Sequence, residues 1–370
     1  MRIGVDARNL VTSITGISRY VLESCRALSE MGHDLILYLP ERQPSNLQLP
    51  GRVNAALAYR GGLLRTVWGQ TRLPILAQRD DLDIFWGPAH RLPTMLSSKL
   101  QAVVTIHDLV WRDASSTMTL QGWLADMSLM GPAISRASRV VAVSNATAVS
   151  LEMAYPNSKQ KTRVVYPGLT VFPEHLALPS EYLDIQRPYM LFVGTLEPRK
   201  NLAKLLQAYA QLPGTIRRQL SLVIAGGPGW KVDHLADLAR LGIADSVRIV
   251  GYVTDAQLAG LYRDAEFLVM VSLYEGFGLP IIEANSMGTP TIVSSTSSLP
   301  EVAGKAAILV DPNNVDEISN AITSLWSDRD LHARLSANAL SNAARFSWKN
   351  TATGLISVFE DALSNSCNSA

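Results

Sequence analysis

The chain has 370 residues, of which 47% are hydrophobic and 18% charged, and its formal net charge is +1. This length exceeds one ordinary hydrophobic core and predicts two domains, while the composition excludes a disordered or fibrous protein. The near-neutral charge argues against a nucleic-acid partner, because such proteins normally carry a strong basic excess.

The cysteines and the N-terminal residues indicate the cellular compartment in which the protein is expected. Cys25 lies in a helical pattern and Cys367 in a polar tail, which is neither a disulfide framework nor a zinc arrangement. Asp6 and Arg8 stand where a signal peptide would have its apolar core. No apolar run approaches the length of about 18 residues that a membrane span needs. We therefore expect a cytoplasmic protein.

Short β-rich runs alternate with amphipathic helical patterns, which predicts parallel sheets covered by helices on both faces. The first series of expected strands is 2–7, 34–40, 83–86, 102–106, 139–143 and 163–166. A second series covers 189–194, 220–226, 247–251, 266–271, 289–294 and 306–310. The fold class is therefore α/β with two Rossmann-like domains, 1–170 and 171–347. A Pro-rich connection at 168–187 joins them, and a last helix occupies 348–370.

The stretch VSLYEGFGLPIIEANSMGTP, which begins at Val271, is the most informative part of the chain. An apolar strand ends there, a turn contains Gly276 and Gly278, and a helix starts near Leu279 with Pro280 in its first turn. Free backbone N–H groups and the positive end of a helix dipole favour a phosphate at such a start. The glycines allow the ligand to approach the backbone.

Two acidic residues flank this helix start, Glu275 before it and Glu283 within its first two turns. A carboxylate beside a bound diphosphate is electrostatically unfavourable, so we expect one to accept hydrogen bonds from a sugar and the other from a ribose. The alternative is that both stabilise the helix dipole, by about 0.3 to 1 kcal/mol each.

Two further loops follow expected strands of the second half. FVGTLEPRKNL places Arg199 and Lys200 at the start of a helix, where adjacent cations suit a diphosphate better than they suit the helix dipole. LVIAGGPGW contains Gly226, but its glycines do not form a dinucleotide-binding fingerprint.

The first half offers two candidates at the carboxyl edge of its sheet. Gly16 opens a helix over 16–31, and its backbone is either a phosphate contact or an ordinary helix start. TIHDL places His107 at the end of a strand, where it could bind or polarise a substrate, or serve only the structure.

With these elements in order, the chain resembles the retaining glycosyltransferases of family 4, which have the GT-B fold. The resemblance rests on VGTLEPRKNL, GYVTDAQLAGLY and YEGFGLPIIEANSMGTPTIVSSTSSLPEVAG, the last with a Glu-x7-Glu pattern as Glu275 and Glu283. It implies two domains facing each other across a cleft, the first binding the acceptor and the second the nucleotide sugar. The helix from Trp348 would pack back on the N-terminal domain.

The resemblance also implies roles for individual residues. Arg199 and Lys200 would neutralise the donor diphosphate, Glu283 would hold the ribose, and Glu275 and His107 would contact the transferred sugar. Backbone amides near Gly278 and Leu279 would meet phosphates, and Tyr252 and Val253 would meet the nucleobase mainly through backbone groups. We expect Gly226, in its glycine-rich loop, to line the donor site. Many members have Gly-x-Gly in the first loop, where this chain has Gly16-Ile17-Ser18. Many members have a second arginine where this chain has Thr195, so Arg199 would carry more of the diphosphate charge.

The expected donor and acceptor rest only on resemblance to known enzymes. GISRY, LEPRKN and GPGWK look most like bacterial mannosyltransferases that use GDP-mannose in O-antigen or related polysaccharide assembly. The acceptor would be a saccharide or a polyprenyl-diphosphate-linked sugar, with retention of configuration and neither cofactor nor metal. A rhamnosyltransferase using dTDP- or GDP-rhamnose is an alternative, as is a sugar-nucleotide 2-epimerase of the same architecture.

Residues 60–79, RGGLLRTVWGQTRLPILAQR, contain four arginines and no acidic residue. Such a basic amphipathic stretch suits an anionic membrane surface, and predicts peripheral contact with the inner face of the cytoplasmic membrane. The alternative is a core-facing helix with a solvated basic side.

Overall fold

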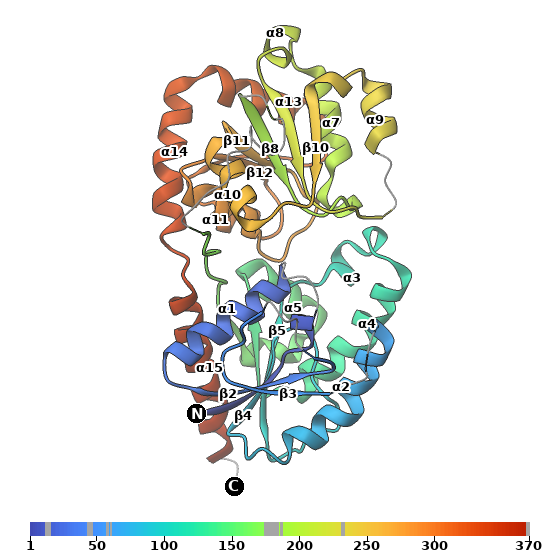
Figure 1. Ribbon diagram of the computed structural model, residues 1–370, viewed down its shortest axis with the longest axis vertical. Helices are drawn as coiled ribbons and strands as arrows, with labels where there is room; N and C mark the ends of the chain where they lie inside the picture. Colours follow the sequence, from blue (N-terminus) through green and yellow to red (C-terminus); the bar gives the residue numbers. More distant parts are fainter. Residues whose placement is uncertain are drawn as a thin grey trace. The chain divides into compact units, whose positions relative to one another are not determined.

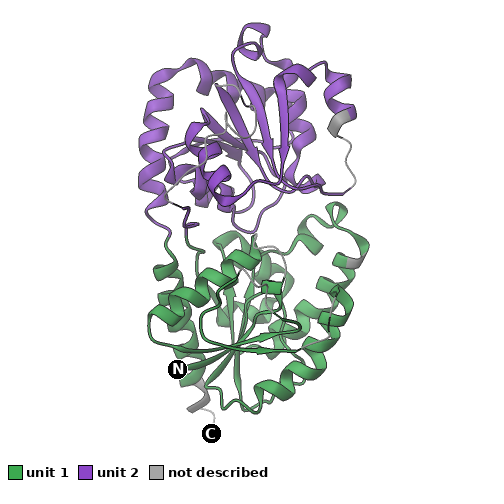
Figure 2. Ribbon diagram, in the orientation of Figure 1, with its two compact units in different colours: residues 1–168, 347–370 green, residues 169–346 purple. Residues whose placement is uncertain are grey.

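The computed structural model describes residues 1–11, 16–42, 47–56, 59, 61–173, 185, 188–230 and 234–367. These form two compact units, residues 1–168 with 347–370 and residues 169–346 (Figure 2). Arg60, most of the expected connection at 168–187 and the last three residues lie outside the described part. Both units combine a parallel sheet with helices, which confirms the predicted α/β class.

Unit 1 is built on a seven-stranded parallel sheet of order β3-β2-β1-β4-β5-β6-β7 (Figure 1). Its strands are β1 (Arg2–Asp6), β2 (Asp34–Leu39), β3 (Arg52–Ala55), β4 (Ile84–Gly87), β5 (Gln101–Ile106), β6 (Arg139–Ala142) and β7 (Thr162–Val164). The sequence reading missed β3, because RVNA is a short, partly exposed edge strand without an apolar run.

Helices cover this sheet on both faces, as its buried strands require. They are α1 (Ile17–Glu30), α2 (Gly62–Ala77), α3 (Val110–Asp113), α4 (Leu120–Arg136), α5 (Asn145–Ala154) and α15 (Trp348–Cys367). Helix α15 packs on α1, β5 and β6, and Phe359 from this helix contacts Trp86 of β4. The opposite face buries Trp68 of α2, Ile134 of α4 and Leu151 of α5.

Unit 2 has a six-stranded parallel sheet of order β10-β9-β8-β11-β12-β13. Its strands are β8 (Tyr189–Val193), β9 (Ser221–Ala225), β10 (Val247–Gly251), β11 (Phe267–Met270), β12 (Thr291–Ser294) and β13 (Ala307–Val310). All six expected strands of the second series are present.

The helices of unit 2 are α7 (Leu202–Gln211), α8 (Gly214–Arg217), α9 (His234–Leu241), α10 (Asp255–Asp264), α11 (Leu279–Ser286), α12 (Leu299–Ala303), α13 (Val315–Ser327) and α14 (Arg329–Ala343). One core cluster joins α7, α9 and α13 to the sheet, and another joins α10 and α11 to it. Because the strands are parallel, the loops after β8, β9 and β11 leave the sheet at the same edge.

Candidate active site

The loop after β8 directs Lys200 across the end of the strand. Lys200 is the last residue of a 3-10 turn, η4 (Pro198–Lys200), and its side chain is buried. Gly194 makes room for its aliphatic stem, because a Cβ at Gly194 would lie 3.2 Å from Lys200 Cε. The ammonium then donates a hydrogen bond of 2.6 Å to Glu275 Oε1. A glycine at the strand end is thus what lets a lysine reach this carboxylate.

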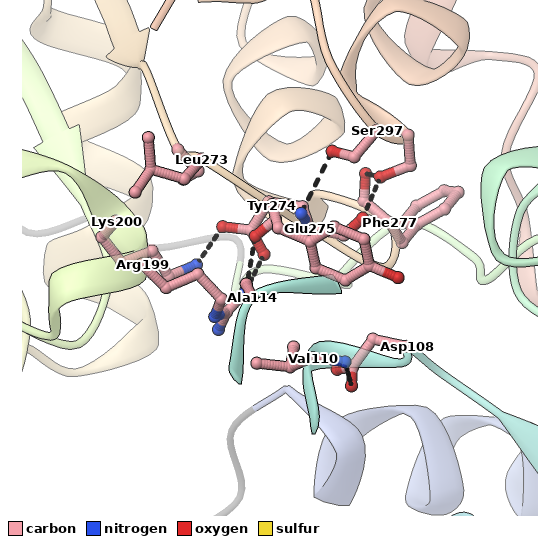
Figure 3. Close-up of polar contacts among 12 residues, drawn as sticks. Asp108, Val110, Ala114, Arg199, Lys200, Leu273, Tyr274, Glu275, Phe277 and Ser297 are labelled. Carbon is pink, nitrogen blue, oxygen red and sulfur yellow. Dashed lines mark hydrogen bonds and ion pairs between the residues drawn. The ribbon is translucent and has the colours of Figure 1, made fainter. Parts of the chain in front are cut away.

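Arg199 binds the other oxygen of the same carboxylate (Figure 3). Its Nη1 donates to Glu275 Oε2 at 2.6 Å and to the carbonyl oxygen of Tyr274 at 3.0 Å. Its Nη2 donates to Glu197 Oε1 at 2.5 Å. Two cations and two carboxylates, all largely buried, therefore form one cluster, here called the ion-pair cluster: Glu197, Arg199, Lys200 and Glu275.

The electrostatics of Glu275 follow from this cluster. Burial favours the neutral carboxylic acid, but the charges of Arg199 and Lys200 and the hydrogen bond from Lys200 outweigh burial, and the pKa of Glu275 falls from 4.5 to about 2. Glu275 is therefore an anion at every physiological pH. It can accept hydrogen bonds from a sugar hydroxyl but cannot donate a proton.

Backbone contacts hold the loops after β8 and β11 together. Leu273 N–H donates to the carbonyl oxygen of Arg199 at 2.9 Å. Asn201, in the left-handed conformation with φ of 58°, donates from Nδ2 to the carbonyl oxygens of Val271 (2.9 Å) and Pro312 (2.7 Å). The position of the two cations is thus fixed relative to Glu275 by a main-chain bond and by the Asn201 side chain as well as by charge.

Helix α11 begins at Leu279, one short turn after Glu275. Gly278 precedes it with φ of 110°, a conformation that favours glycine. Within the described part of the chain, the backbone N–H groups of Gly278 and Leu279 meet no acceptor, whereas Ile281 N–H donates to the carbonyl oxygen of Gly278 at 3.0 Å. Ser298 Oγ donates to the carbonyl oxygens of Glu275 and Phe277 and supports the turn from behind. The turn therefore offers two backbone donors, as an anion requires.

Glu283 has different partners. It is buried and accepts hydrogen bonds from Tyr262 Oη at 2.8 Å and from Thr170 Oγ1. The Glu-x7-Glu spacing thus places one carboxylate among cations and the other among hydroxyl groups.

The loop after β9 lies against the loop after β8. A Cβ at Gly226 would stand 1.9 Å from the carbonyl oxygen of Gly194, so the two loops touch through their backbones. Gly226 N–H donates to the carbonyl oxygen of Gly251, which precedes Tyr252 and Val253. Tyr252 is 66% exposed, whereas Val253 packs against the core of unit 2. The segment at Tyr252 and Val253 therefore follows a residue whose backbone is hydrogen-bonded to the loop after β9.

His107 and Gly16 belong to unit 1. His107 follows β5 and is buried, with Nε2 at 2.7 Å from the carbonyl oxygen of Pro88, so Nε2 carries the proton. Burial and the neighbouring His90 lower the pKa of His107 from 6.5 to about 3. His107 is therefore neutral, with an unprotonated Nδ1. Gly16 precedes α1 with φ of 47° and has open space around it, while residues 12–15 of its loop lie outside the described part.

Two family models match the chain, one described as "Glycosyltransferase Family 4" over residues 14–171 and one as "Glycosyl transferases group 1" over residues 180–341. The O-antigen chain mannosyltransferase B of Escherichia coli is 32% identical over 94% of this chain and 96% of its own length. The chain belongs to glycosyltransferase family 4.

Other proteins are similar to this chain as well. The MMP alpha-(1->4)-mannosyltransferase of Mycolicibacterium hassiacum is 26% identical over 98% of both chains. The crystal structure of HepE from Anabaena in complex with UDP and glucose has a TM-score of 0.77 at 17% identity, covering 97% of this chain and 99% of that one. This similarity supports the predicted GT-B fold of this glycosyltransferase.

Three features of this glycosyltransferase escaped the sequence reading. The first is Glu197, although LEPRK places this acid two residues before Arg199. The second is Asn201, whose side chain joins two loops. The third is His90, which accepts a hydrogen bond from His107 N–H at 3.0 Å. An acidic residue inside a basic loop was a usable signal for Glu197. No local pattern pointed to His90, which lies 17 residues before its partner.

No group of three or more His, Cys, Asp or Glu residues within the described part is arranged to hold a metal ion. No described helix is long and apolar enough to cross a membrane.

Proposed function

We propose that this glycosyltransferase transfers mannose from GDP-mannose to a saccharide or polyprenyl-diphosphate-linked acceptor, in the assembly of O-antigen or another surface polysaccharide. The observation that carries the proposal is the pairing of Lys200 with Glu275 beside the start of α11. This arrangement offers cations and backbone donors to a diphosphate, and a fixed anion to a sugar. Similarity to the Escherichia coli O-antigen mannosyltransferase over nearly the whole chain supports the choice of sugar and pathway.

In the proposed reaction the bond between the anomeric carbon and the donor diphosphate breaks with oxocarbenium character. Lys200 and the amides of Gly278 and Leu279 would stabilise the negative charge that develops on the leaving diphosphate. Glu275 and the neutral His107 would accept hydrogen bonds from hydroxyl groups of the sugar, and Glu283 from those of the ribose. We further propose that the base is held by the backbone at Tyr252 and Val253.

The new glycosidic bond forms between the anomeric carbon and an acceptor oxygen, and the acceptor proton passes to an oxygen of the leaving diphosphate. This route retains the configuration and needs no protein base, consistent with the low pKa values of Glu275 and His107. We propose that the reaction requires neither a metal ion nor a cofactor, because Lys200 and the backbone N–H groups at the start of α11 supply the positive charge.

The test measures thermal stabilisation and slow donor hydrolysis with GDP-mannose, GDP-rhamnose, dTDP-rhamnose, UDP-glucose and UDP-N-acetylglucosamine, each with and without EDTA. We expect stabilisation and EDTA-resistant hydrolysis with GDP-mannose alone. A response to a rhamnose donor alone would replace mannose by rhamnose, and conversion of a donor to its 2-epimer would identify an epimerase. No response to any donor would overturn the proposal, and loss of hydrolysis with EDTA would overturn metal independence.

We also propose that unit 1 contacts an anionic membrane surface through α2. Leu63, Leu64 and Val67 of this helix are 71%, 48% and 45% exposed, and the stretch has no acidic residue. Leu120, Leu124 and Met127 of α4 are exposed as well. Arg91 connects the two helices, donating hydrogen bonds to Thr66 and Asp126 (both 3.3 Å). Exposed leucines beside arginines suit an anionic lipid surface.

Co-sedimentation with vesicles of phosphatidylglycerol or phosphatidylcholine tests this contact. We expect binding to the anionic vesicles alone, weakened by salt and by Leu63→Ser with Leu64→Ser. The matched control is Val149→Ser on α5, which changes an apolar residue that is 52% exposed on another helix. Equal binding of the double variant, or no binding of the wild type at low salt, would overturn the contact.

A further inference from the structure

Glu197 is a buried acid in a loop that the proposed function expects to face a dianionic diphosphate. Only 7% of its surface is exposed. Its Oε1 accepts a hydrogen bond from Arg199 Nη2 at 2.5 Å. A carboxylate there repels a bound diphosphate, so Glu197 would weaken donor binding unless its charge is used by another residue of the site.

The contacts of Arg199 indicate that use. One end of the guanidinium is held by Glu197, and the other donates to Glu275 Oε2 and to the carbonyl oxygen of Tyr274. A guanidinium is planar, so fixing Nη2 also fixes the direction in which Nη1 donates. Glu197 thereby aims Arg199 at Glu275.

Lys200 contrasts with its neighbour. Its ammonium has three N–H groups, and the hydrogen bond described for it uses one, toward Glu275 Oε1 at 2.6 Å. The two cations and two carboxylates of the ion-pair cluster sum to zero charge. A diphosphate would thus meet a neutral cluster in which Lys200 retains donors and Arg199 is held by two acids.

We propose that Glu197 is a positioning residue that holds Arg199 against Glu275 and away from the donor diphosphate. In this division of labour Lys200 and the amides before α11 meet the diphosphate, while Arg199 fixes the carboxylate that contacts the sugar. The inference rests on the proposed function and sharpens it, since it assigns Arg199 to the sugar side of the site.

Loss of the Glu197 charge then has two opposite effects. Arg199 is freed to turn toward the diphosphate, so a nucleoside diphosphate binds as tightly as before or more tightly. Glu275 loses a fixed partner, and misplacement of such a group by about 1 Å can cost up to about 100-fold in rate. A purely structural role for Glu197 would instead weaken nucleotide binding together with stability.

The experiment compares Glu197→Gln and Glu197→Ala with wild type and with Asp237→Asn, a control that removes a charge from the exposed pair with Arg240. GDP affinity is measured by calorimetry, and kcat and KM by transfer or hydrolysis of GDP-mannose. We expect kcat to fall about 10-fold in the glutamine variant, which keeps an acceptor for Arg199, and further in the alanine variant, with GDP affinity undiminished. Unchanged kcat, or weaker GDP binding in proportion to lost thermal stability, would overturn the inference.

A double-mutant cycle keeps the inference falsifiable should Glu197→Ala fail to fold. Because Glu197 acts through Arg199, adding Glu197→Gln to Arg199→Ala should change kcat less than about 2-fold. Additive losses would show that Glu197 acts independently and would overturn the inference. A wild type that neither binds GDP nor consumes GDP-mannose would instead overturn the proposed donor, in which case UDP and dTDP replace GDP in the same comparison.

Discussion

The buried side chains at the strand ends differ in charge between the two units. After β8 and β11, unit 2 keeps four charges in contact, and the pKa of Glu275 falls to about 2. After β5, unit 1 keeps His107 neutral beside His90, with a pKa of about 3. The strand ends of unit 2, here called the charged edge, hold ionised side chains. The end of β5 in unit 1, here called the neutral edge, holds uncharged hydrogen-bonding groups.

The two kinds of strand end are suited to different parts of group transfer. A charged cluster with backbone N–H groups beside it can stabilise a leaving diphosphate, because its dipoles and ions are already oriented before the reaction. A neutral imidazole can orient a hydroxyl group without attracting the diphosphate. The following predictions test this contrast.

The largest expected effect is at the charged edge. Lys200→Ala should lower turnover at least about 100-fold, because it removes a cation that the leaving diphosphate requires. Steady-state kinetics with the donor checks this. Lys204→Ala, which removes a partly exposed lysine of α7, is the matched control and should keep wild-type turnover. Near-wild-type turnover of Lys200→Ala would remove Lys200 from the site.

The neutral edge predicts a dependence of stability on pH. In the unfolded chain His107 binds a proton near its ordinary pKa of 6.5, but in the folded chain only near pH 3. Stability is therefore fully present above pH 6.5 and is lost as the pH falls toward 3, by at most about 1.4 kcal/mol per pH unit. Urea unfolding of His107→Gln should show a shallower loss between pH 6.5 and 5. An identical slope in variant and wild type would contradict the neutral assignment.

Glu275 should affect the free energy of unfolding in a lower pH range than His107 does. Its pKa is 4.5 ordinarily and about 2 in the folded chain, so its contribution to stability is complete above pH 4.5 and is lost as the pH falls toward 2. Glu275→Gln should therefore change the pH dependence of unfolding only below about pH 4.5, while the slope between pH 6.5 and 5 is kept. A changed slope in the upper range would mean that the two edges are not independent.

The smallest expected effect is a loss of stability when the backbone contact between the loops after β8 and β9 is disturbed. A Cβ at Gly226 would lie 1.9 Å from the carbonyl oxygen of Gly194, so Gly226→Ala should cost about 1 to 3 kcal/mol of unfolding free energy. Gly227→Ala is the control, because a Cβ there has no neighbour within 4 Å. Urea denaturation of both variants measures the difference. Equal stability would show that the two loops separate at little cost.

Much of the fold was predictable because parallel strands buried on both faces leave continuous apolar runs in the sequence. All six strands of unit 2 are predicted in this way, and the helix expected over 16–31 corresponds to α1 (Ile17–Glu30). The edge strand β3 was missed because it is short and half exposed, so it leaves no such run. Of the site, the pattern of residues placed Lys200, Arg199 and Glu275 at strand ends.

The α/β class, the loops at the strand ends and the resemblance to family 4 are predictable from the residues alone, because they depend on local spacing and residue type. Tertiary structure alone decided that Arg199 is shared between Glu197 and Glu275, and that Glu283 is bonded to Tyr262 and Thr170. It also decided the charge states of Glu275 and His107. The physical reason is that a pKa and an ion pair depend on burial and on neighbours that lie far away in the chain.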